Sequence, residues 1–308
     1  MITFDKRKKM KKKFFLIVIC FALIITSLAF CLTGCSNIVK ISKKKPLDLT
    51  GMELVFEDNF DGDLNSDVWA TTFDNPIRRG GYWTEEQTFT KDGSLIIRTE
   101  YKENGSQGAG WYTGTCLSQH KKEFTYGYFE AKCKAPAAEG LWSAFWMQAE
   151  NMAQNLSTDG GKNGAEIDIM ESPFYNDPAM TIKYRNTTLH TIHVDGYGDD
   201  HKATSSKYFE VNKDIYNEFN TYGVLWTENE YVFYINGYET WRTDFGVSQV
   251  PEFLWLSVEI AGESGSANPS NKDNQFTWAG EITNNPKDKA YDFVVDYVKV
   301  YQFANKKH

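Results

Sequence analysis

The sequence predicts an all-β protein folded as a sandwich of two antiparallel sheets. Short runs of alternating apolar and polar residues, separated by turn residues, follow one another from Met52 to about Phe303, a pattern typical of strands. Aromatic residues make up 15% of the chain and glycine contributes 23 residues, which favours strands and turns. No long amphipathic helix is apparent, and at most a helical turn or two is expected around residues 213–217. Because composition does not change along this run, we expect one domain, with a concave face that could bind a polymer.

Six segments carry the strand pattern most clearly. They are Ser94–Glu100, Tyr126–Lys132, Leu141–Met147, Glu230–Ile235, Phe253–Ile260 and Tyr291–Gln302. The first follows a Lys-Asp-Gly turn. Asn236-Gly237 follows the fourth and leads into a further strand, and this dipeptide is the strongest short-range signal for a β-hairpin.

The first 34 residues predict a lipoprotein signal peptide. Seven Lys and Arg residues precede an uncharged apolar run from Phe14 to Leu32. The following residues, Leu32–Ser36, resemble a bacterial lipobox, with cleavage before Cys35 and lipidation of that cysteine. An uncleaved transmembrane anchor is the alternative, because the apolar run is long enough to span a bilayer. Both interpretations predict an exported protein held at the bacterial cell membrane and facing outside the cytoplasm.

The rest of the chain divides into three parts. Residues 35–51 are expected to form the lipidated cysteine and a short tether, whose lysines would lie near anionic headgroups. The main domain is expected at residues 52–303, with a C-terminal tail at 304–308.

Net charge restricts the partners of the exported part. Loss of residues 1–34 removes seven Lys/Arg and one Asp from totals of 33 and 41, which leaves 26 basic and 40 acidic residues and a net charge of −14. A surface this acidic disfavours nucleic acids and polyanionic glycans. Neutral polymers remain candidates, and we expect a monomer.

Cys116 and Cys133 are the cysteines that follow Cys35. If their two strands formed a hairpin turning near Phe124, the thiols would lie nearly opposite each other, and an exported protein permits a disulfide. Two buried free thiols are the alternative.

Three carboxylates lie close together in Gly164–Glu171: Glu166, Asp168 and Glu171. Successive side chains of a strand point to opposite faces, so Glu166 and Asp168 share one face. Glu171 joins them only if a β-bulge around Ile169-Met170 absorbs one extra residue. A half-buried strand with an acidic solvent face would show the same sequence pattern.

With the bulge, the order Glu, Asp, Glu fits retaining glycoside hydrolysis. That reaction needs a carboxylate nucleophile and a carboxylic acid that donates a proton, about 5–5.5 Å apart. A short aspartate between two glutamates leaves this gap open. Its charge also raises the pKa of the proton donor.

The same segment resembles the active-site strand of glycoside hydrolase family 16 in its bulged form. Further similarities follow in the family's order: Phe124–Lys132 and Gly140–Met147 resemble the two preceding strands, Glu218–Trp226 resembles a later F-H-x-Y-x-x-x-W segment with Asn220 in place of His, and Val294–Tyr301 resembles the closing strand. The resemblance covers residues 52–303. It implies a concanavalin-like β-jelly-roll sandwich, endo-acting cleavage with retention of anomeric configuration, and no required cofactor.

The resemblance also implies roles for single residues. Glu166 is expected to be the nucleophile, Glu171 the general acid/base and Asp168 the carboxylate that orients them. Trp142 and Trp146 share a strand face and are expected on the floor of the cleft, where an indole covers the C–H face of a sugar. Packing of one of them in the core is the alternative.

Other candidate binding residues are spread along the chain. Trp83, Trp111 and Trp278 lie in expected loops and could line distant subsites, and Glu259 is either a sugar contact or an exposed strand acid.

Histidines are a separate group of candidates. His193 resembles a family histidine near the acid/base, whereas His190 would face the other side of a regular strand. A zinc site formed by His190, His193 and His201 is disfavoured, because their spacing matches no compact ligand motif.

A structural calcium ion is left open. Residues 58–63 are acidic and turn-like, but Phe60 lies where an EF-hand needs a ligand oxygen. The resemblance implies a calcium between this segment and Asp296 on the convex side. Asn59 stands where the family has Glu, which replaces a carboxylate with an amide.

The leading substrate is a polysaccharide of the β-1,3-glucan or mixed-linkage β-glucan class. Leu256–Glu263 departs from the L-N-x-x-x-G-G pattern of laminarinases, so a β-galactoside polymer, cut by an agarase-type or endo-β-galactosidase activity, is the alternative. A transglycosylase would use the same residues. A non-catalytic glycan-binding sandwich shares the fold, but the three carboxylates argue against it.

Overall fold

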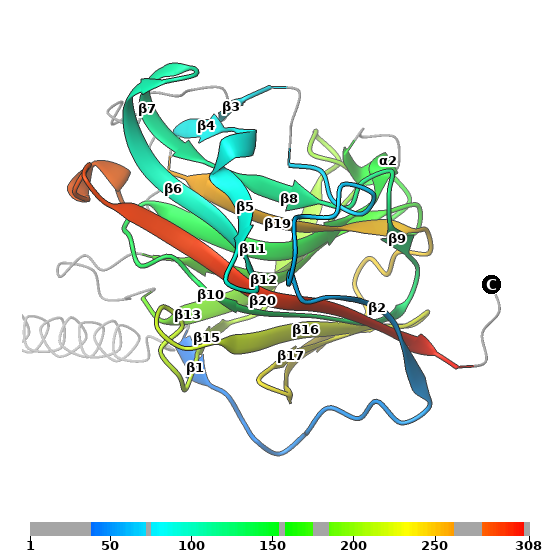
Figure 1. The fold of residues 1–308 in the computed structure, drawn as a ribbon. Helices are drawn as coiled ribbons and strands as arrows, with labels where there is room; N and C mark the ends of the chain where they lie inside the picture. The colour runs from blue at the N-terminus through cyan, green and yellow to red at the C-terminus, as the bar shows by residue number, and fades with distance from the viewer. Residues whose placement is uncertain (1–37, 72–74, 154–157, 175–184, 262–278, 305–308) are drawn as a thin grey trace, which may run out of the picture. The chain divides into compact units, whose positions relative to one another are not determined.

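The computed structural model describes residues 38–71, 75–153, 158–174, 185–261 and 279–304 (Figure 1). The chain divides into two units, residues 1–37 and 38–308. The predicted signal peptide and Cys35 lie outside the described residues. Among the described residues, no helix has the length and apolar character needed to cross a membrane.

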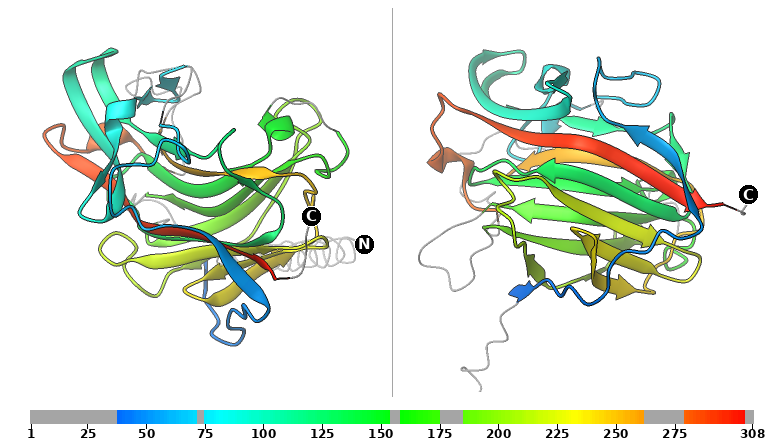
Figure 2. Two further views of the ribbon diagram at one scale, coloured as in Figure 1. Left: turned by 45° about the vertical axis from the view of Figure 1, so that its right-hand side comes forward. Right: turned by 60° about the horizontal axis from the view of Figure 1, so that its bottom comes forward.

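The second unit is an all-β sandwich, which confirms the predicted fold class (Figures 1 and 2). The first sheet has nine strands in the order β1-β15-β13-β12-β11-β19-β8, with β14 beside β13 and β9 beside β19. Their bounds are β1 Ile38–Lys40, β8 Thr115–Leu117, β9 Glu123–Phe124, β11 Leu141–Gln148, β12 Ala165–Pro173, β13 Thr187–Val194, β14 Lys202–Ser205, β15 Tyr208–Glu210 and β19 Glu252–Ile260.

The second sheet has eleven strands in the order β18-β17-β16-β10-β20-β6-β7-β4-β3, with β2 beside β20 and β5 beside β6. Their bounds are β2 Met52–Asp58, β3 Ile77–Arg78, β4 Gly81–Trp83, β5 Thr88–Lys91, β6 Ser94–Gly105, β7 Gly108–Thr113, β10 Gly127–Lys134, β16 Asn220–Trp226, β17 Tyr231–Ile235, β18 Tyr238–Thr243 and β20 Ala290–Phe303. Three short helices complete the described structure: η1 Glu85–Gln87, α2 Glu150–Ala153 and η3 Ile282–Asn284. The six predicted strand segments and the Asn236-Gly237 hairpin are confirmed.

The main core lies between the two sheets. On β11, Phe145 and Met147 are fully buried in this core. Trp146 and Ala144 alternate with them and therefore point to the other face. Figure 2 shows that β11, β12 and β19 curve, so this outer face of the first sheet is concave.

The folded unit begins earlier than the sequence suggests. β1 pairs in parallel with β15, and Ile41 is buried. The Leu47 amide donates to the Gly237 carbonyl, and Lys45 lies 2.8 Å from a Glu239 carboxylate oxygen. The expected tether is therefore wrong for residues 38–51, which pack along the sheets as a part of the domain.

The hairpin expected between the two cysteine strands is also wrong. Cys116 lies on β8, which pairs with β19 in the first sheet. Cys133 lies on β10, between β16 and β20 in the second sheet. Both are buried free thiols, and burial raises the pKa of each well above that of an ordinary cysteine.

Candidate active site

β12 contains the predicted β-bulge. Its pairing with β13 passes from Asp168 opposite Thr191 directly to Glu171 opposite Leu189. On the other side, its pairing with β11 skips Ile169. One extra residue is thus absorbed between the second and third acids, as the sequence predicts.

The bulge turns Glu171 onto the face that carries the other two acids. Thr191, the residue opposite Asp168, donates its hydroxyl hydrogen bond to Glu171 Oε2 over 2.8 Å. Ile169 and Met170, which lie between the acids, are fully buried in the core. Three carboxylates therefore lie in one row along β12.

Glu166 is held by two donors on one oxygen. Gln148 Nε2 donates to Glu166 Oε2 over 3.1 Å, and the Tyr197 hydroxyl donates to the same atom. The other oxygen, Oε1, lies 3.7 Å from His193 Nε2. This arrangement fixes the carboxylate plane and leaves Oε1 as the atom that could attack an anomeric carbon.

The environment separates the two glutamates electrostatically. Burial raises the pKa of Glu166 to about 7, with a further increase from Asp168, and His193 opposes the rise. Burial and Asp168 raise the pKa of Glu171 well above its ordinary value. Burial alone would lower the pKa of His193, but its contact with Asp168 and the charges of the two glutamates raise it to about 9. Burial therefore favours the protonated form of Glu171, which is the form that an acid catalyst needs.

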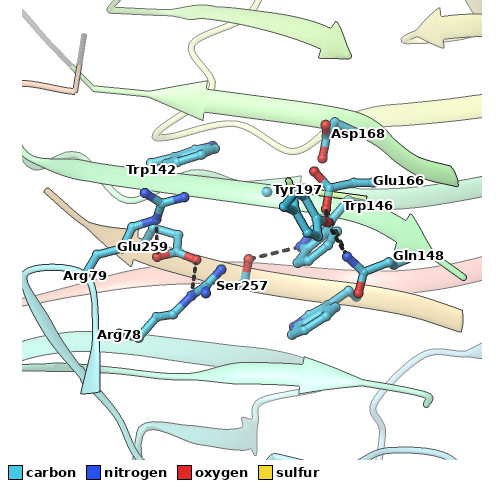
Figure 3. Close-up of a pocket in the computed structure, with 12 residues that line it drawn as sticks. Arg78, Arg79, Trp142, Trp146, Gln148, Glu166, Asp168, Tyr197, Ser257 and Glu259 are labelled. Carbon is cyan, nitrogen blue, oxygen red and sulfur yellow. Dashed lines mark hydrogen bonds and ion pairs between the residues drawn. The ribbon is translucent and has the colours of Figure 1, made fainter. Parts of the chain in front are cut away.

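A cleft lined by Glu166 and Asp168 lies on the concave face (Figure 3). Its volume is about 460 Å³, and it is lined by Arg78, Arg79, Trp142, Ala144, Trp146, Gln148, Glu166, Asp168, Tyr197, Trp255, Ser257 and Glu259. Both tryptophans predicted for the cleft floor, Trp142 and Trp146, are among the lining residues.

Trp146 is rigidly supported. Its ring stacks on Trp255 at a centroid distance of 4.1 Å and an interplanar angle of 10°. Its Nε1 donates to Ser257 Oγ over 3.1 Å. A fixed apolar plane next to the nucleophile suits the C–H face of a pyranose ring.

The prediction that Trp83 and Trp111 line distant subsites is wrong. Trp111 is fully buried in the main core, where its ring contacts Tyr101. Trp83 is 3% exposed, packs under Trp255 and donates to a backbone carbonyl. Both lie on strands instead of loops, and Trp278 lies outside the described residues.

Glu259 is a partner of two arginines at one end of the cleft. Its Oε1 lies 2.7 Å from Arg78 Nε and its Oε2 lies 2.9 Å from Arg79 Nε. The Arg79 guanidinium lies over the Trp142 ring, 4.9 Å from its centroid (Figure 3). Burial lowers the pKa of Arg79 and Glu259 opposes that change. Glu259 is 5% exposed, so the expectation of an exposed strand acid is wrong.

The histidines lie on both sides of β13. His193 is opposite Glu166, and its Nε2 lies 3.4 Å from Asp168 Oδ2. His201 contacts its other nitrogen over 2.9 Å. His190 is fully buried on the opposite side, so these three histidines do not converge on a zinc site. Among the described residues, Glu166, Asp168 and His193 form the one group of at least three acids, histidines or cysteines close enough to share a metal ion.

The residues proposed for calcium are engaged elsewhere. Asp296 lies 2.7 Å from the Lys132 ammonium group. Asp58 accepts hydrogen bonds from the Phe60 amide and the Trp69 indole. Both carboxylates thus have partners within the protein, and a calcium ion at this segment stays a prediction.

Several cleft residues were missed from the sequence. Gln148 lies on the same face of β11 as Trp142 and Trp146, because every second residue of a strand points to the same side, so the sequence pattern could have identified it. Ser257 and Trp255 could have been found in the same way from Glu259 on β19. Tyr197, Arg78 and Arg79 reach the cleft from a loop or a two-residue strand, which carry no periodic signal.

Comparisons with known proteins agree with this geometry. A family model described as the GH16 domain of β-porphyranases A–D matches residues 54–303. Glucan endo-1,3-β-glucosidase A1 of Niallia circulans is 22% identical over 85% of this chain and 40% of its own length. Endo-1,3-1,4-β-glycanase ExsH of Rhizobium meliloti is 29% identical over 58% of this chain and 30% of its own length. The chain thus spans less than half the length of these two relatives.

The solved structures that match share the fold. The catalytic domain of a laminarinase from Thermotoga petrophila has a TM-score of 0.62 and 21% identity, covering 82% of this chain and 99% of that domain. The endo-β-1,3-glucanase of Pyrococcus furiosus has a TM-score of 0.63 and 21% identity, covering 84% of this chain and 98% of that enzyme. The predicted jelly-roll sandwich is confirmed.

Proposed function

The chain belongs to the β-porphyranase A–D group of glycoside hydrolase family 16, and from this premise we propose that it is an endo-acting hydrolase that cuts a β-linked polysaccharide with retention of anomeric configuration. The observation that carries the proposal is the row Glu166, Asp168, Glu171 on the bulged strand β12, beside an aromatic cleft. No cofactor is required, because two carboxyl groups supply both the nucleophile and the proton.

Each step of the reaction has a residue in place. Glu166 Oε1 attacks the anomeric carbon while Glu171 gives its proton to the departing glycosidic oxygen, so the glycosidic bond breaks as an ester to Glu166 forms. Glu171, now a carboxylate, takes a proton from the incoming water, which releases the sugar from Glu166 and restores both groups. Burial and then the negative charge of Asp168 raise the pKa of Glu171, which favours its protonated form between turnovers.

The leading substrate is a β-1,3-glucan or a mixed-linkage β-glucan. Relatives described as a glucan endo-1,3-β-glucosidase and as an endo-1,3-1,4-β-glycanase support this class. The stacked Trp146 and Trp255 offer an apolar floor, which binds sugars without requiring charge on them. A neutral polymer also suits the acidic chain.

A β-galactan that carries anionic groups is the second candidate. It is favoured by the two arginines at one end of the cleft and by the description of the matching family. A relative described as the κ-carrageenase of Pseudoalteromonas carrageenovora is 24% identical over 50% of this chain and 42% of its own length. With Glu259 between them, Arg78 and Arg79 keep a net positive charge of one, which would attract a sulfate ester.

Incubation of residues 36–308 with laminarin, lichenan, agarose and porphyran tests both candidates. Oligosaccharides from laminarin or lichenan support the glucan assignment, and products from porphyran alone support the galactan. The control is Glu166→Gln, which should lower turnover by at least about 10⁴-fold. Turnover that survives in this variant would refute the role of Glu166. Product analysis in the presence of excess oligosaccharide separates hydrolysis from transglycosylation.

We also propose that the enzyme is exported and anchored to the bacterial cell membrane by a lipid on Cys35. The support is the basic and apolar leader followed by Leu32–Ser36. Expression of the full chain with a radiolabelled fatty acid in bacteria should label the membrane fraction. Cys35→Ser should abolish the label. A wild-type chain that stays in the membrane fraction without the label would instead indicate an uncleaved anchor. The enzyme is proposed to act as a monomer.

A further inference from the structure

His190 faces the bulge of β12. Asp168 pairs with Thr191 and Glu171 pairs with Leu189, so the one residue between those partners on β13 is His190. The two residues of the bulge, Ile169 and Met170, therefore lie opposite a single residue of β13, His190. Every bulge leaves backbone groups without ladder partners, and these groups need another acceptor or donor when they are buried.

The histidine side chain supplies that partner. His190 Nδ1 lies 2.6 Å from the carbonyl oxygen of Ile169. A carbonyl only accepts, so the proton is on Nδ1. At the other side of the ring, Nε2 lies 2.9 Å from Thr240 Oγ1, and this hydroxyl also lies 3.1 Å from the Phe233 carbonyl, so the second sheet offers both contacts at this end of the ring. Burial lowers the pKa of His190 to about 4, in agreement with a neutral ring that has this one tautomer.

The ring is anchored in the second sheet. His190 is fully buried and stacks on Phe233 of β17 at a centroid distance of 4.7 Å. Thr240 belongs to β18 in the same sheet. A buried imidazole is costly unless its nitrogens are hydrogen-bonded. Both ring nitrogens have a partner within hydrogen-bond distance here. Contacts with the second sheet therefore fix the position of His190, and His190 in turn fixes the bulge.

Neighbouring residues of β13 fix the residue that follows the bulge. The Thr188 hydroxyl donates to the backbone carbonyl of Glu171 over 3.0 Å, and Thr191 donates to its carboxyl group. If the bulge were lost, the period of the strand would turn Glu171 toward the core. Glu166, before the bulge, would keep its orientation.

We propose that His190 is a positioning residue for Glu171, which fixes the bulge that brings the acid/base onto the catalytic face. This inference rests on the proposed function and names how the fold places one of its two carboxyl groups. Loosening the bulge should harm proton donation more than nucleophilic attack.

The leaving group of the substrate separates these two effects. A polysaccharide needs Glu171 to protonate the departing sugar oxygen, whereas a dinitrophenolate leaves without a proton. The test compares kcat/KM for the polymer that the wild-type enzyme cuts with kcat/KM for the dinitrophenyl glycoside of the disaccharide it releases. A wild-type enzyme that cuts none of the polymers would refute the proposed function. An active wild type whose variants lack the expected selectivity would refute only this inference.

Four variants make the test specific. His190→Phe keeps an aromatic ring and removes both hydrogen bonds. His190→Asn keeps a donor near the position of Nδ1, and Thr240→Val removes the hydroxyl on the far side. Ile192→Ala creates a cavity on the same strand, opposite Ile167, and is the control for lost stability.

The expected result is a loss on the order of 100-fold in kcat/KM for the polymer in His190→Phe, with a much smaller loss for the activated glycoside. His190→Asn should recover most of the polymer activity, and Thr240→Val should show a weaker form of the same selectivity. Ile192→Ala should lower the melting temperature and leave the ratio between the two substrates unchanged. Equal losses on both substrates in His190→Phe, or a changed ratio in Ile192→Ala, would overturn the inference.

Discussion

His193 Nε2 lies 3.4 Å from Asp168 Oδ2 and 3.7 Å from Glu166 Oε1, so one imidazole faces two of the three carboxylates of the row. With a pKa of about 9, this imidazole is a cation at neutral pH. Its charge opposes the rise in the pKa of Glu166, which still reaches about 7. The histidine therefore helps to keep the nucleophile ionised.

Replacement of His193 by Gln should move the pH dependence of activity. Loss of the positive charge raises the pKa of Glu166 further, because an opposite charge at this distance favours the ionised carboxylate. The acidic limb of kcat/KM, which reports ionisation of the nucleophile in the free enzyme, should move to higher pH by roughly 1 unit. Initial rates between pH 4.5 and 9 measure the shift. His201→Asn, which keeps His193, should give a smaller change, and an acidic limb that stays in place in His193→Gln would contradict the assigned role.

Replacement of Tyr197 by Phe should weaken the nucleophile without disturbing the cleft. Tyr197 donates to Glu166 Oε2, and this hydrogen bond lowers the pKa of Glu166. Hydrogen bonds to charged groups contribute about 1.5–3 kcal/mol, so kcat/KM should fall by about 10- to 100-fold, with most of the loss in kcat. Tyr238→Phe, on β18 in the other sheet, is the matched control. An effect on KM alone would instead assign Tyr197 to substrate binding.

Replacement of Glu259 by Gln should destabilise one end of the cleft and strengthen the binding of anionic sugars there. Glu259 is nearly fully buried, whereas its partners Arg78 and Arg79 are about a quarter exposed. Removal of one partner from such a cluster leaves two cations close together, at a cost of about 2–3 kcal/mol after allowance for solvent. Chemical denaturation measures this loss. Inhibition by a sulfated oligosaccharide should become stronger in the variant, and it should weaken again in Glu259→Gln combined with Arg79→Gln.

Much of the fold and the centre of the site could be predicted because their signals are local. Alternation of apolar and polar residues identified strands such as β11 and β19, and the Asn236-Gly237 turn identified a hairpin. The bulge was predicted for a chemical reason, since without it Glu171 would face the core. The period of the strand placed Glu166 and Asp168 on one face, and two-carboxylate chemistry together with the resemblance to family 16 placed Glu171 beside them.

The parts that could not be predicted depend on contacts distant in sequence. Trp111 has the same side chain as Trp146, but β7 packs it into the main core, and no local pattern separates the two cases. Cys116 and Cys133 lie in different sheets because β8 and β10 are not adjacent strands, which follows from topology and not from spacing. Arg78 and Arg79 reach the cleft because Glu259, far along the chain, pairs with both.

Burial of Glu252 provides a prediction about stability as a function of pH. Glu252 is fully buried, and its Oε1 accepts a hydrogen bond from the Ala165 amide over 3.1 Å, at the start of the catalytic strand. Burial raises its pKa from 4.5 to about 8. The folded-state pKa lies above the unfolded one, so its contribution to the free energy of unfolding is complete below pH 4.5 and is lost as the pH rises through 8.

Replacement of Glu252 by Gln should remove this dependence. The amide oxygen still accepts from Ala165, and no charge can form in the core. Relative to the wild type, the free energy of unfolding of Glu252→Gln should increase as the pH rises from 5 to 9, by up to about 4 kcal/mol. Denaturant unfolding at several pH values measures the difference. Glu53→Gln, which replaces an exposed acid on β2, should show the same pH dependence of the free energy of unfolding as the wild type. If Glu252→Gln also shows the wild-type pH dependence, then Glu252 is already ionised in the folded protein near neutral pH.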